Sequence, residues 1–300
     1  MKGYKAFNKG LICKGKQYKE NETFEEESAV PCHRGMHFCK NPFDVLNFYD
    51  LVDENGEFSD FAEVEAQDDA EVKTDDNIKY CTTKLKIGAK FSFAGFVKTC
   101  VDFVIEKTQP EKPDSGDSAK IGSSGDSAKI GSSGDSAKIG SSGYYAKIGS
   151  SGYSAQIGSS GDSAQIGSSG YSAKIGSSGD SAKIGSSGDS AKIGSSGYSA
   201  KIGSSGYSAQ IGSSGDSAQI GSSGDSAKIK STGYDSVICC AGDDSCVSAK
   251  KGSWITLAEW KYSYEKDRYV PKCVKTEYVD GERIKEDTMY KLIDGEFTEV

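Results

Sequence analysis

The pattern of apolar and polar positions is most regular in the middle of the chain. Between residues 116 and 229 a nine-residue unit, G-[D/Y]-S-A-[K/Q]-I-G-S-S, recurs thirteen times. Its alanine and isoleucine are two positions apart, which places both side chains on one face of a short strand. The Gly-Ser-Ser-Gly segment between strands is typical of a turn. One such strand cannot bury its apolar face, whereas stacked copies build a continuous core. The repeat therefore predicts a parallel β-solenoid.

The repeat varies mainly at two positions. The second is Asp in eight copies and Tyr in five, and the fifth is Lys in nine and Gln in four. We expect both positions to face solvent and to form ladders along the solenoid. Either two or three units make one turn; with two, thirteen units give a rod of roughly 31 Å at the usual strand spacing. A flexible Gly/Ser linker is the alternative, but the strict Ala-x-Ile pattern favours the solenoid.

The flanking segments have no nine-residue period and differ in composition. Residues 1–108 mix aromatic and charged residues, which predicts a small α+β domain with strands near 4–7, 36–39, 61–66, 80–87 and 91–97. Asn41, Pro42 and Asp44 predict the start of a short helix. Residues 109–115 read as a linker. Residues 230–300 predict a β-rich cap and a small meander, because Asp280-Gly281 and Asp294-Gly295 are hairpin signals. The predicted fold class is mainly β.

Composition narrows the classes of function. The chain has 44 acidic and 36 basic residues and a formal charge of −8, which argues against binding to nucleic acid or to an acidic membrane surface. No apolar run approaches a membrane span, and the first residues lack the apolar core of a signal peptide. Nine cysteines in a chain of this length do not suggest a disulfide framework. We therefore expect a cytoplasmic protein with reduced thiols.

Two sets of residues are candidates for binding a partner. Residues 44–76 hold thirteen acids and one lysine, which is typical of a solvated face and also suits docking to a basic partner. The repeat tyrosines form the second set. The candidate binding residues are Asp53, Glu54, Glu57, Asp60, Asp68, Asp69, Tyr144, Tyr153, Tyr171, Tyr198 and Tyr207.

A metal site is a further hypothesis. Cys32, His33, His37 and Cys39 lie within eight residues, and thiolate and imidazole are the ligands that zinc prefers. Structural zinc sites usually join two ligand pairs from separate segments, so we favour the interpretation of G-M-H-F-C as a half-buried strand with Met36 and Phe38 inward. Calcium is disfavoured, because five repeats carry Tyr where a carboxylate ligand would be needed. We expect no cofactor and no catalytic set of residues.

Several phrases resemble a known family. MKGYKAFNKGLICKGKQY, GMHFCKNPFDVLNFYDL, KGSWITLAEW and KTEYVDGERIK are similar to an uncharacterised family of bacterial and bacteriophage proteins, in which a domain of unknown function precedes Gly/Ser-rich repeats. The resemblance implies a phage or prophage context in a Gram-positive host. It thereby implies a host protein as partner, such as a defence or regulatory complex.

A second similarity is to the ADP-ribosyltransferase fold. There an early strand, a glycine-led aromatic strand and a following helix shape an NAD cleft, and residues 35–39 followed by the helix at Asn41 resemble that order. The catalytic residues of that fold cannot be placed; Glu63 and Glu65 are the nearest E-x-E-like pair. Our main hypothesis is a non-enzymatic interaction module on a rigid solenoid. The alternatives are an NAD-using transferase and a self-assembling, homo-oligomeric spacer.

Overall fold

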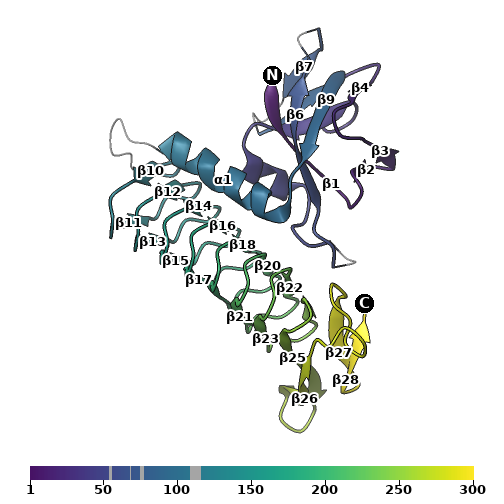
Figure 1. Cartoon of the computed structure of the whole chain (residues 1–300), viewed down its shortest axis with the longest axis vertical. Coiled ribbons are helices and arrows are strands. Elements are labelled where there is room, and N and C mark those ends of the chain that lie inside the picture. Colours follow the sequence, from purple (N-terminus) through teal and green to yellow (C-terminus); the bar gives the residue numbers. More distant parts are fainter. Residues whose placement is uncertain (54–55, 68, 75–77, 109–115) are drawn as a thin grey trace.

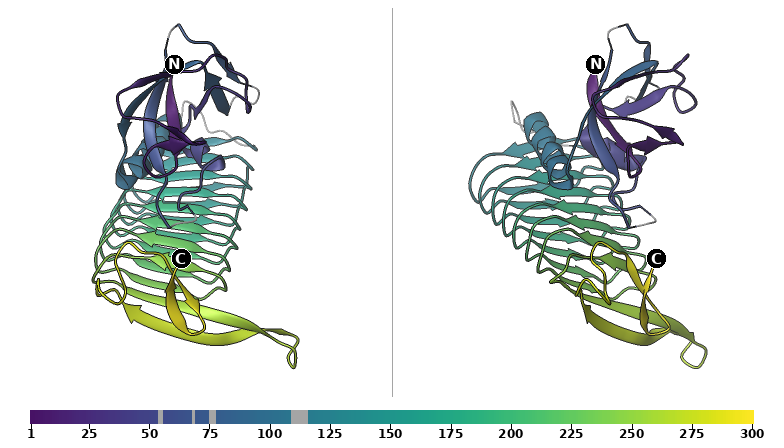
Figure 2. Two further views of the ribbon diagram at one scale, coloured as in Figure 1. Left: turned by 90° about the vertical axis from the view of Figure 1, so that its right-hand side faces the viewer. Right: turned by 45° about the vertical axis from the view of Figure 1, so that its right-hand side comes forward.

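The computed structural model describes residues 1–53, 56–67, 69–74, 78–108 and 116–300, so the expected linker at 109–115 lies outside the described residues. The chain forms an N-terminal body of strands β1–β9 with the short helix η1, then the helix α1, the solenoid, and two terminal hairpins (Figure 1). The N-terminal body and α1 lie on one side of the solenoid, as Figure 2 shows.

The N-terminal body is built on a seven-stranded sheet. The strand order is β4-β9-β6-β1-β5-β8-β7, and all neighbours are antiparallel. The expected strands at 4–7, 36–39 and 61–66 are present, and the region 80–87 holds two strands instead of one. Met36 and Phe38 point into the core as expected. The strands are β1 (Lys2–Phe7), β2 (Ile12–Cys13), β3 (Lys16–Gln17), β4 (Thr23–Glu25), β5 (Met36–Cys39), β6 (Asp60–Ala66), β7 (Val72–Thr74), β8 (Lys79–Thr82) and β9 (Lys84–Lys90).

The expected helix after Asn41 is present as the 3-10 helix η1 (Pro42–Asn47). The Asn41 side chain accepts a hydrogen bond from the Phe43 amide at 3.0 Å, and Pro42 occupies the first turn, where its missing N–H needs no partner. The helix buries Phe43, Val45 and Leu46 against the N-terminal body.

The prediction of a strand at 91–97 is wrong, because the helix α1 (Phe93–Thr108) begins in this segment. Ser92 accepts a hydrogen bond from the Gly95 amide at 3.1 Å and starts the helix. The seven residues 91–97 are rich in apolar side chains, but they are too few to distinguish a helical spacing from that of a strand. Over the longer segment the apolar residues follow a helical spacing of three and four. They lie at positions 93, 96, 97, 100, 101 and 104.

The repeats form a parallel β-solenoid with two nine-residue units in each turn. Each strand pairs with the strand 18 residues further on, so that Ile139 lies beside Ile157 and Ile148 beside Ile166. The solenoid has about 8 turns over residues 120–257, more than thirteen repeats require, because strands continue after the repeat decays. The repeat alanines and isoleucines are buried in one continuous core.

The solenoid has two sheets, one from every second strand. The first contains β10 (Lys120–Ser123), β12 (Lys138–Ser141), β14 (Gln156–Ser159), β16 (Lys174–Ser177), β18 (Lys192–Ser195), β20 (Gln210–Ser213), β22 (Lys228–Ser231) and β24 (Cys246–Ser248). The second contains β11 (Lys129–Ser132), β13 (Lys147–Ser150), β15 (Gln165–Ser168), β17 (Lys183–Ser186), β19 (Lys201–Ser204), β21 (Gln219–Ser222), β23 (Val237–Cys240) and β25 (Trp254–Ser263).

Stacking explains the glycine that opens each unit. A Cβ atom on Gly152 would lie 1.8 Å from the carbonyl oxygen of Gly134, and the equivalent approach recurs along the solenoid. No side chain can be accommodated at that distance, so the turns can stack only with glycine here.

The two sheets differ in what covers them, and this corrects one expectation. The fifth repeat position was expected to face solvent in every copy. It does so in the second sheet, but in the first sheet Gln156 is 8% exposed and Lys174 is 6% exposed, because η1 and α1 lie over them. We call the first the covered sheet and the second the exposed sheet.

The C-terminal residues cap the end of the solenoid. Strands β25 and β26 (Arg268–Tyr278) form a hairpin that extends the exposed sheet. Strands β27 (Tyr290–Ile293) and β28 (Glu296–Glu299) form another, which pairs with β24. Asp294-Gly295 makes its turn as expected, with φ of 50° and 77°. Asp280-Gly281 does not form a hairpin, because the turn that closes β25 and β26 lies between residues 263 and 268.

The end of the solenoid is apolar and covered by this cap. Val279, Ile284, Tyr290 and Leu292 join the core of the last turns. The vicinal cysteines of β23 point to opposite sides of the strand: Cys240 is buried, whereas Cys239 is exposed.

Candidate functional site

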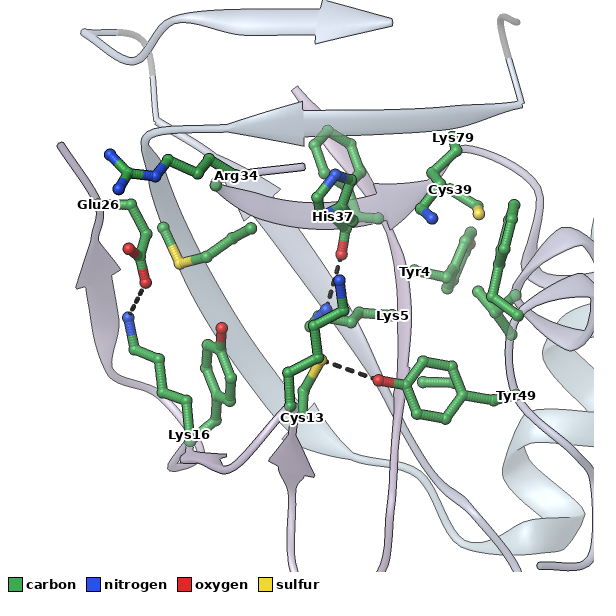
Figure 3. Close-up of a pocket in the computed structure, with 18 of the residues that line it drawn as sticks. Tyr4, Lys5, Cys13, Lys16, Glu26, Arg34, His37, Cys39, Tyr49 and Lys79 are labelled. Carbon is green, nitrogen blue, oxygen red and sulfur yellow. Dashed lines mark hydrogen bonds and ion pairs between the residues drawn. The ribbon is translucent and has the colours of Figure 1, made fainter. Parts of the chain in front are cut away.

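The N-terminal body contains a pocket with a volume of about 410 Å³, within the usual range for small-molecule sites. Strands β1, β2 and β5 and the segment after η1 supply its walls (Figure 3). Its lining residues include Tyr4, Lys5, Cys13, Lys14, Lys16, Tyr18, Glu26, His33, Arg34, His37, Cys39, Phe48, Tyr49 and Lys79.

Lys5 is a buried amine at the wall of this pocket. Its Nζ donates a hydrogen bond to the carbonyl oxygen of His37 at 2.8 Å, and the Cys13 thiol lies beside it. The same amine lies 5.3 Å and 5.8 Å from the ring centroids of Phe7 and Tyr18. Burial lowers the pKa of Lys5, since the charged form loses hydration. Strand β1 holds this side chain in place through its pairing with β5 and β6 on either side.

Two other groups of the pocket are held by local hydrogen bonds. The Tyr49 hydroxyl donates to the Cys13 sulfur at 2.8 Å, and burial together with this bond raises the pKa of Tyr49. Burial, with Lys79 and Lys5 nearby, lowers the pKa of His37 to about 4, so its ring is neutral at pH 7. The ring nitrogen Nε2 accepts the Cys32 amide hydrogen at 3.1 Å.

The candidate zinc ligands are only partly brought together. His33, His37 and Cys39 line the pocket, whereas Cys32 does not. Burial raises the pKa of Cys39 to about 12, which keeps its thiol protonated and disfavours it as a thiolate ligand. Among the described residues, no group of three or more His, Cys, Asp or Glu side chains is placed to hold a metal ion.

The pocket is cationic in a chain that is acidic overall. Lys5, Lys14, Lys16, Arg34 and Lys79 line it, against the single carboxylate of Glu26 among its lining residues. Glu26 pairs with Lys16. The arrangement suits an anionic ligand with an apolar part, because both cations and aromatic rings line the pocket. Sequence reasoning named His33, His37 and Cys39 of this lining but missed its cations, since these come from separate segments that only the fold brings together.

Three of the candidate acids form hydrogen bonds or ion pairs within the N-terminal body. Asp60 is 6% exposed and accepts hydrogen bonds from the Gly10 and Leu11 amides at 2.7 and 3.0 Å. Asp53 accepts the Glu57 amide within a loop, and Asp69 pairs with Lys84 at 2.9 Å. Glu54 and Asp68 lie outside the described residues.

Other acids of the 44–76 run contact the solenoid of the same chain. Asp44 accepts a hydrogen bond from Gln156 at 3.0 Å, and Asp50 accepts one from Gln210 at 2.8 Å. Glu57 lies 3.5 Å from the amine of Lys230, which replaces a repeat glycine in β22. Part of the acidic run therefore serves as an internal docking surface for repeat lysines and glutamines.

The five candidate tyrosines are exposed along the edges of the solenoid. Their exposed fractions range from 46% to 56%. Tyr153 and Tyr171 are stacked, with ring centroids 5.1 Å apart, and Tyr207 follows on the same edge after Asp189. Tyr144 and Tyr198 lie on the opposite edge, since they precede strands of the other sheet.

The aspartates at the same repeat position stabilise the stack. The Asp189 carboxylate accepts the Tyr207 amide hydrogen at 2.8 Å, and Asp180 accepts that of Tyr198 at the same distance. Each bond joins one turn to the next, 18 residues on. Asp is thus a structural residue at this position, and the copies that carry Tyr lack this carboxylate bridge to the next turn.

The exposed sheet carries a continuous polar surface. Its fifth-position side chains point outward, and beside them runs a column of seventh-position glycines. Shallow grooves of about 560 Å³ and 720 Å³ lie over this column, the first around Gly149 and the second around Gly203.

Residues 1–99 match the family described as Domain of unknown function (DUF7666). The matched DUF7666 region contains every strand of the N-terminal body, the pocket and the first turns of α1. No curated protein and no solved structure matches the chain. No helix among the described residues is long and apolar enough to cross a membrane.

Proposed function

We propose that this protein is a non-enzymatic interaction module, in which the solenoid presents a rigid, repetitive surface to a partner protein. One observation carries the proposal: the N-terminal body occupies only the covered sheet, so the exposed sheet and both tyrosine edges remain accessible along the solenoid. Solenoids commonly use such extended surfaces for binding.

The architecture supports a rigid scaffold. Backbone hydrogen bonds join every strand to the next turn, and isoleucine and alanine form one core from the first turns to the cap. A partner would therefore meet side chains at fixed intervals of about 4.8 Å. The family resemblance adds the finer proposal that the partner is a host protein in the cytoplasm, such as a defence or regulatory complex.

A pull-down tests this function. The tagged full chain is incubated with a Gram-positive host lysate, beside a variant in which the five candidate tyrosines are replaced by Asp and the exposed-sheet lysines by Gln. The repeat itself carries Asp and Gln at these positions, so the variant should fold. A stoichiometric partner retained by the native chain and lost by the variant supports the proposal. Retention of the same partner by both, or of none, contradicts it.

The position of the pocket favours a second candidate, an NAD-using transferase. The pocket lies between β1, β5 and the segment around η1, the elements that carry the resemblance to the ADP-ribosyltransferase fold. Its cations suit a dinucleotide phosphate. Glu63 and Glu65 lie on β6 and do not line the pocket, so the acidic residue of such an enzyme would have to be Glu26.

Calorimetry with NAD separates the two candidates. The native chain and Lys5→Met are titrated with NAD, and NAD consumption is followed in parallel. The transferase requires binding heat and turnover that Lys5→Met loses. If the native chain shows neither binding heat nor turnover, the transferase is excluded, and the proposal of an interaction module is not affected.

A further inference from the structure

The two sheets of the solenoid present the same side chains in the same order. Along the covered sheet the fifth positions read Lys, Lys, Gln, Lys, Lys, Gln, Lys, and along the exposed sheet they read Lys, Lys, Gln, Lys, Lys, Gln. Every one of these strands has glycine two positions later, except β22. The chemistry that binds the N-terminal body is therefore present twice.

On the covered sheet the glycine column accommodates a helix. Cβ atoms on Gly176 and Gly194 would lie 3.2 and 3.0 Å from Val101 and Val97 side-chain atoms, and one on Gly212 would lie 2.5 Å from the Phe93 ring. The apolar stripe of α1 thus packs directly on the bare backbone of the sheet. Small residues are what allow a helix to approach a sheet so closely.

The fifth-position lysines and glutamines beside that column form the Lys/Gln row, and this row makes hydrogen bonds with the N-terminal body. Lys192 donates to the carbonyl oxygens of Leu46 and Tyr49 at 2.8 and 3.2 Å and lies 3.3 Å from the Asp50 carboxylate. Gln210 accepts the Leu51 amide at 2.7 Å and donates to Asp50. The row holds a segment rich in carbonyl and carboxylate oxygens next to the docked helix.

On the exposed sheet the equivalent surface is open. A Cβ atom on Gly149, Gly167, Gly185 or Gly203 would meet no atom of the described residues within 4 Å. The row residues beside them are exposed, and grooves of about 560 and 720 Å³ follow the column. This row carries four lysines and no acid. They are Lys129, Lys147, Lys183 and Lys201.

The dimensions fit a helix of ordinary length. Helix α1 has 16 residues, which span about 24 Å at 1.5 Å per residue. It contacts strands of five successive turns, β10 to β18, and the four spacings between them span about 19 Å. The exposed sheet offers the same length of glycine column.

We propose that the exposed sheet is a docking face for an amphipathic helix of a partner protein, whose apolar stripe lies on the glycine column and whose flanking carboxylates face the lysine row. The inference rests on the proposed function and names the partner's chemistry. Helix α1 already occupies the covered sheet, so it does not supply this helix. A second copy would oppose one lysine row to another, which disfavours face-to-face pairing.

A helical peptide tests the face directly. The probe is a fluorescein-labelled, lactam-bridged peptide of residues 92–108 with Lys98 and Lys107 replaced by Glu, and its binding to the full chain is followed by anisotropy. Binding should weaken at least tenfold in the chain variant Gly185→Leu/Gly203→Leu, which closes the column. It should weaken with Lys183→Gln/Lys201→Gln and at high salt.

The control variant is Tyr171→Leu/Tyr207→Leu, which adds leucines on the edge and should bind the peptide like the native chain. Absence of peptide binding, or equal binding by the glycine variant, overturns the docking face. Light scattering that shows a dimer abolished by the same glycine variant would assign the face to a second copy instead and would also overturn it. In each of these cases a host partner that depends on the tyrosines would still support the interaction module.

Discussion

Replacing Gly212 or the equivalent Gly203 by alanine tests how tightly the N-terminal half of the chain packs on the solenoid. Both residues occupy the seventh repeat position, but Gly212 lies on the covered sheet and Gly203 on the exposed sheet. A methyl group at Gly212 would lie 2.5 Å from the Phe93 ring and 3.0 Å from the Phe58 ring. These two rings are stacked with centroids 4.1 Å apart, which restricts how far either can move.

The expected magnitude follows from two opposing terms. Replacing glycine by alanine stabilises a compatible site by about 0.4–1 kcal/mol, because the unfolded chain loses conformational freedom. Overpacking a close contact costs about 1–3 kcal/mol. The first term is common to both variants and the second applies to Gly212→Ala alone, so Gly212→Ala should be about 1–3 kcal/mol less stable than Gly203→Ala.

Urea unfolding of the two variants under identical conditions provides the comparison. Hydrogen exchange of the α1 amides should accelerate in Gly212→Ala and stay at the native rate in Gly203→Ala, since α1 contacts the covered sheet. Equal stability of the two variants, or a less stable Gly203→Ala, would refute the packing of α1 on the glycine column.

Three further predictions concern single contacts. Lys230→Gly restores the repeat glycine but removes a buried amine that donates to the Gly56 carbonyl at 2.8 Å, so unfolding in urea should show a loss of about 1–3 kcal/mol; no loss would contradict a docking role. Burial lowers the pKa of Lys174 to about 8 from 10.5. As the pH rises, the amine therefore loses its proton at a lower pH in the folded chain than in the unfolded chain. The free energy of unfolding of the native chain, minus that of Lys174→Gln, should therefore rise between pH 8 and 10.5. A difference that stays flat or falls over this range would be inconsistent with the buried amine. Asp189→Ser frees the amide of the next turn and should lower stability by about 0.5–1.5 kcal/mol, whereas Tyr171→Ser removes no such bond and should have a smaller effect; equal losses would argue against the carboxylate bridge.

The sequence could predict those features that depend on neighbours in the chain. The Ala-x-Ile pair predicted strands with one buried face, and the nine-residue period predicted their stacking. The cap at Asn41 predicted η1 for the same reason, since an N-cap acts on amides only two residues away. The helix at Phe93 was missed because a seven-residue window does not separate helical from strand periodicity.

The cations of the candidate site could not be predicted from the sequence. They come from β1, the β2–β3 hairpin, the loop before β5, and β8, and their positions in the chain show no common spacing. The candidate acids were visible as a charged run, but their partners were not. Glu57 and Lys230 are far apart in sequence, so only the folded chain shows that they meet.

The repeat by itself determined that this chain forms a parallel β-solenoid, because every unit carries the same strand, the same turn and the same apolar pair. It left open whether two or three units make one turn, and the pairing of strands 18 residues apart decided on two. The repeat could not distinguish the two sides, since identical units alternate between them. The tertiary structure decided that α1 and η1 lie on one sheet, which buries Lys174 there while Lys183, nine residues later, remains exposed on the other. The physical reason is that burial of a repeat side chain depends on long-range packing, which a local pattern does not encode.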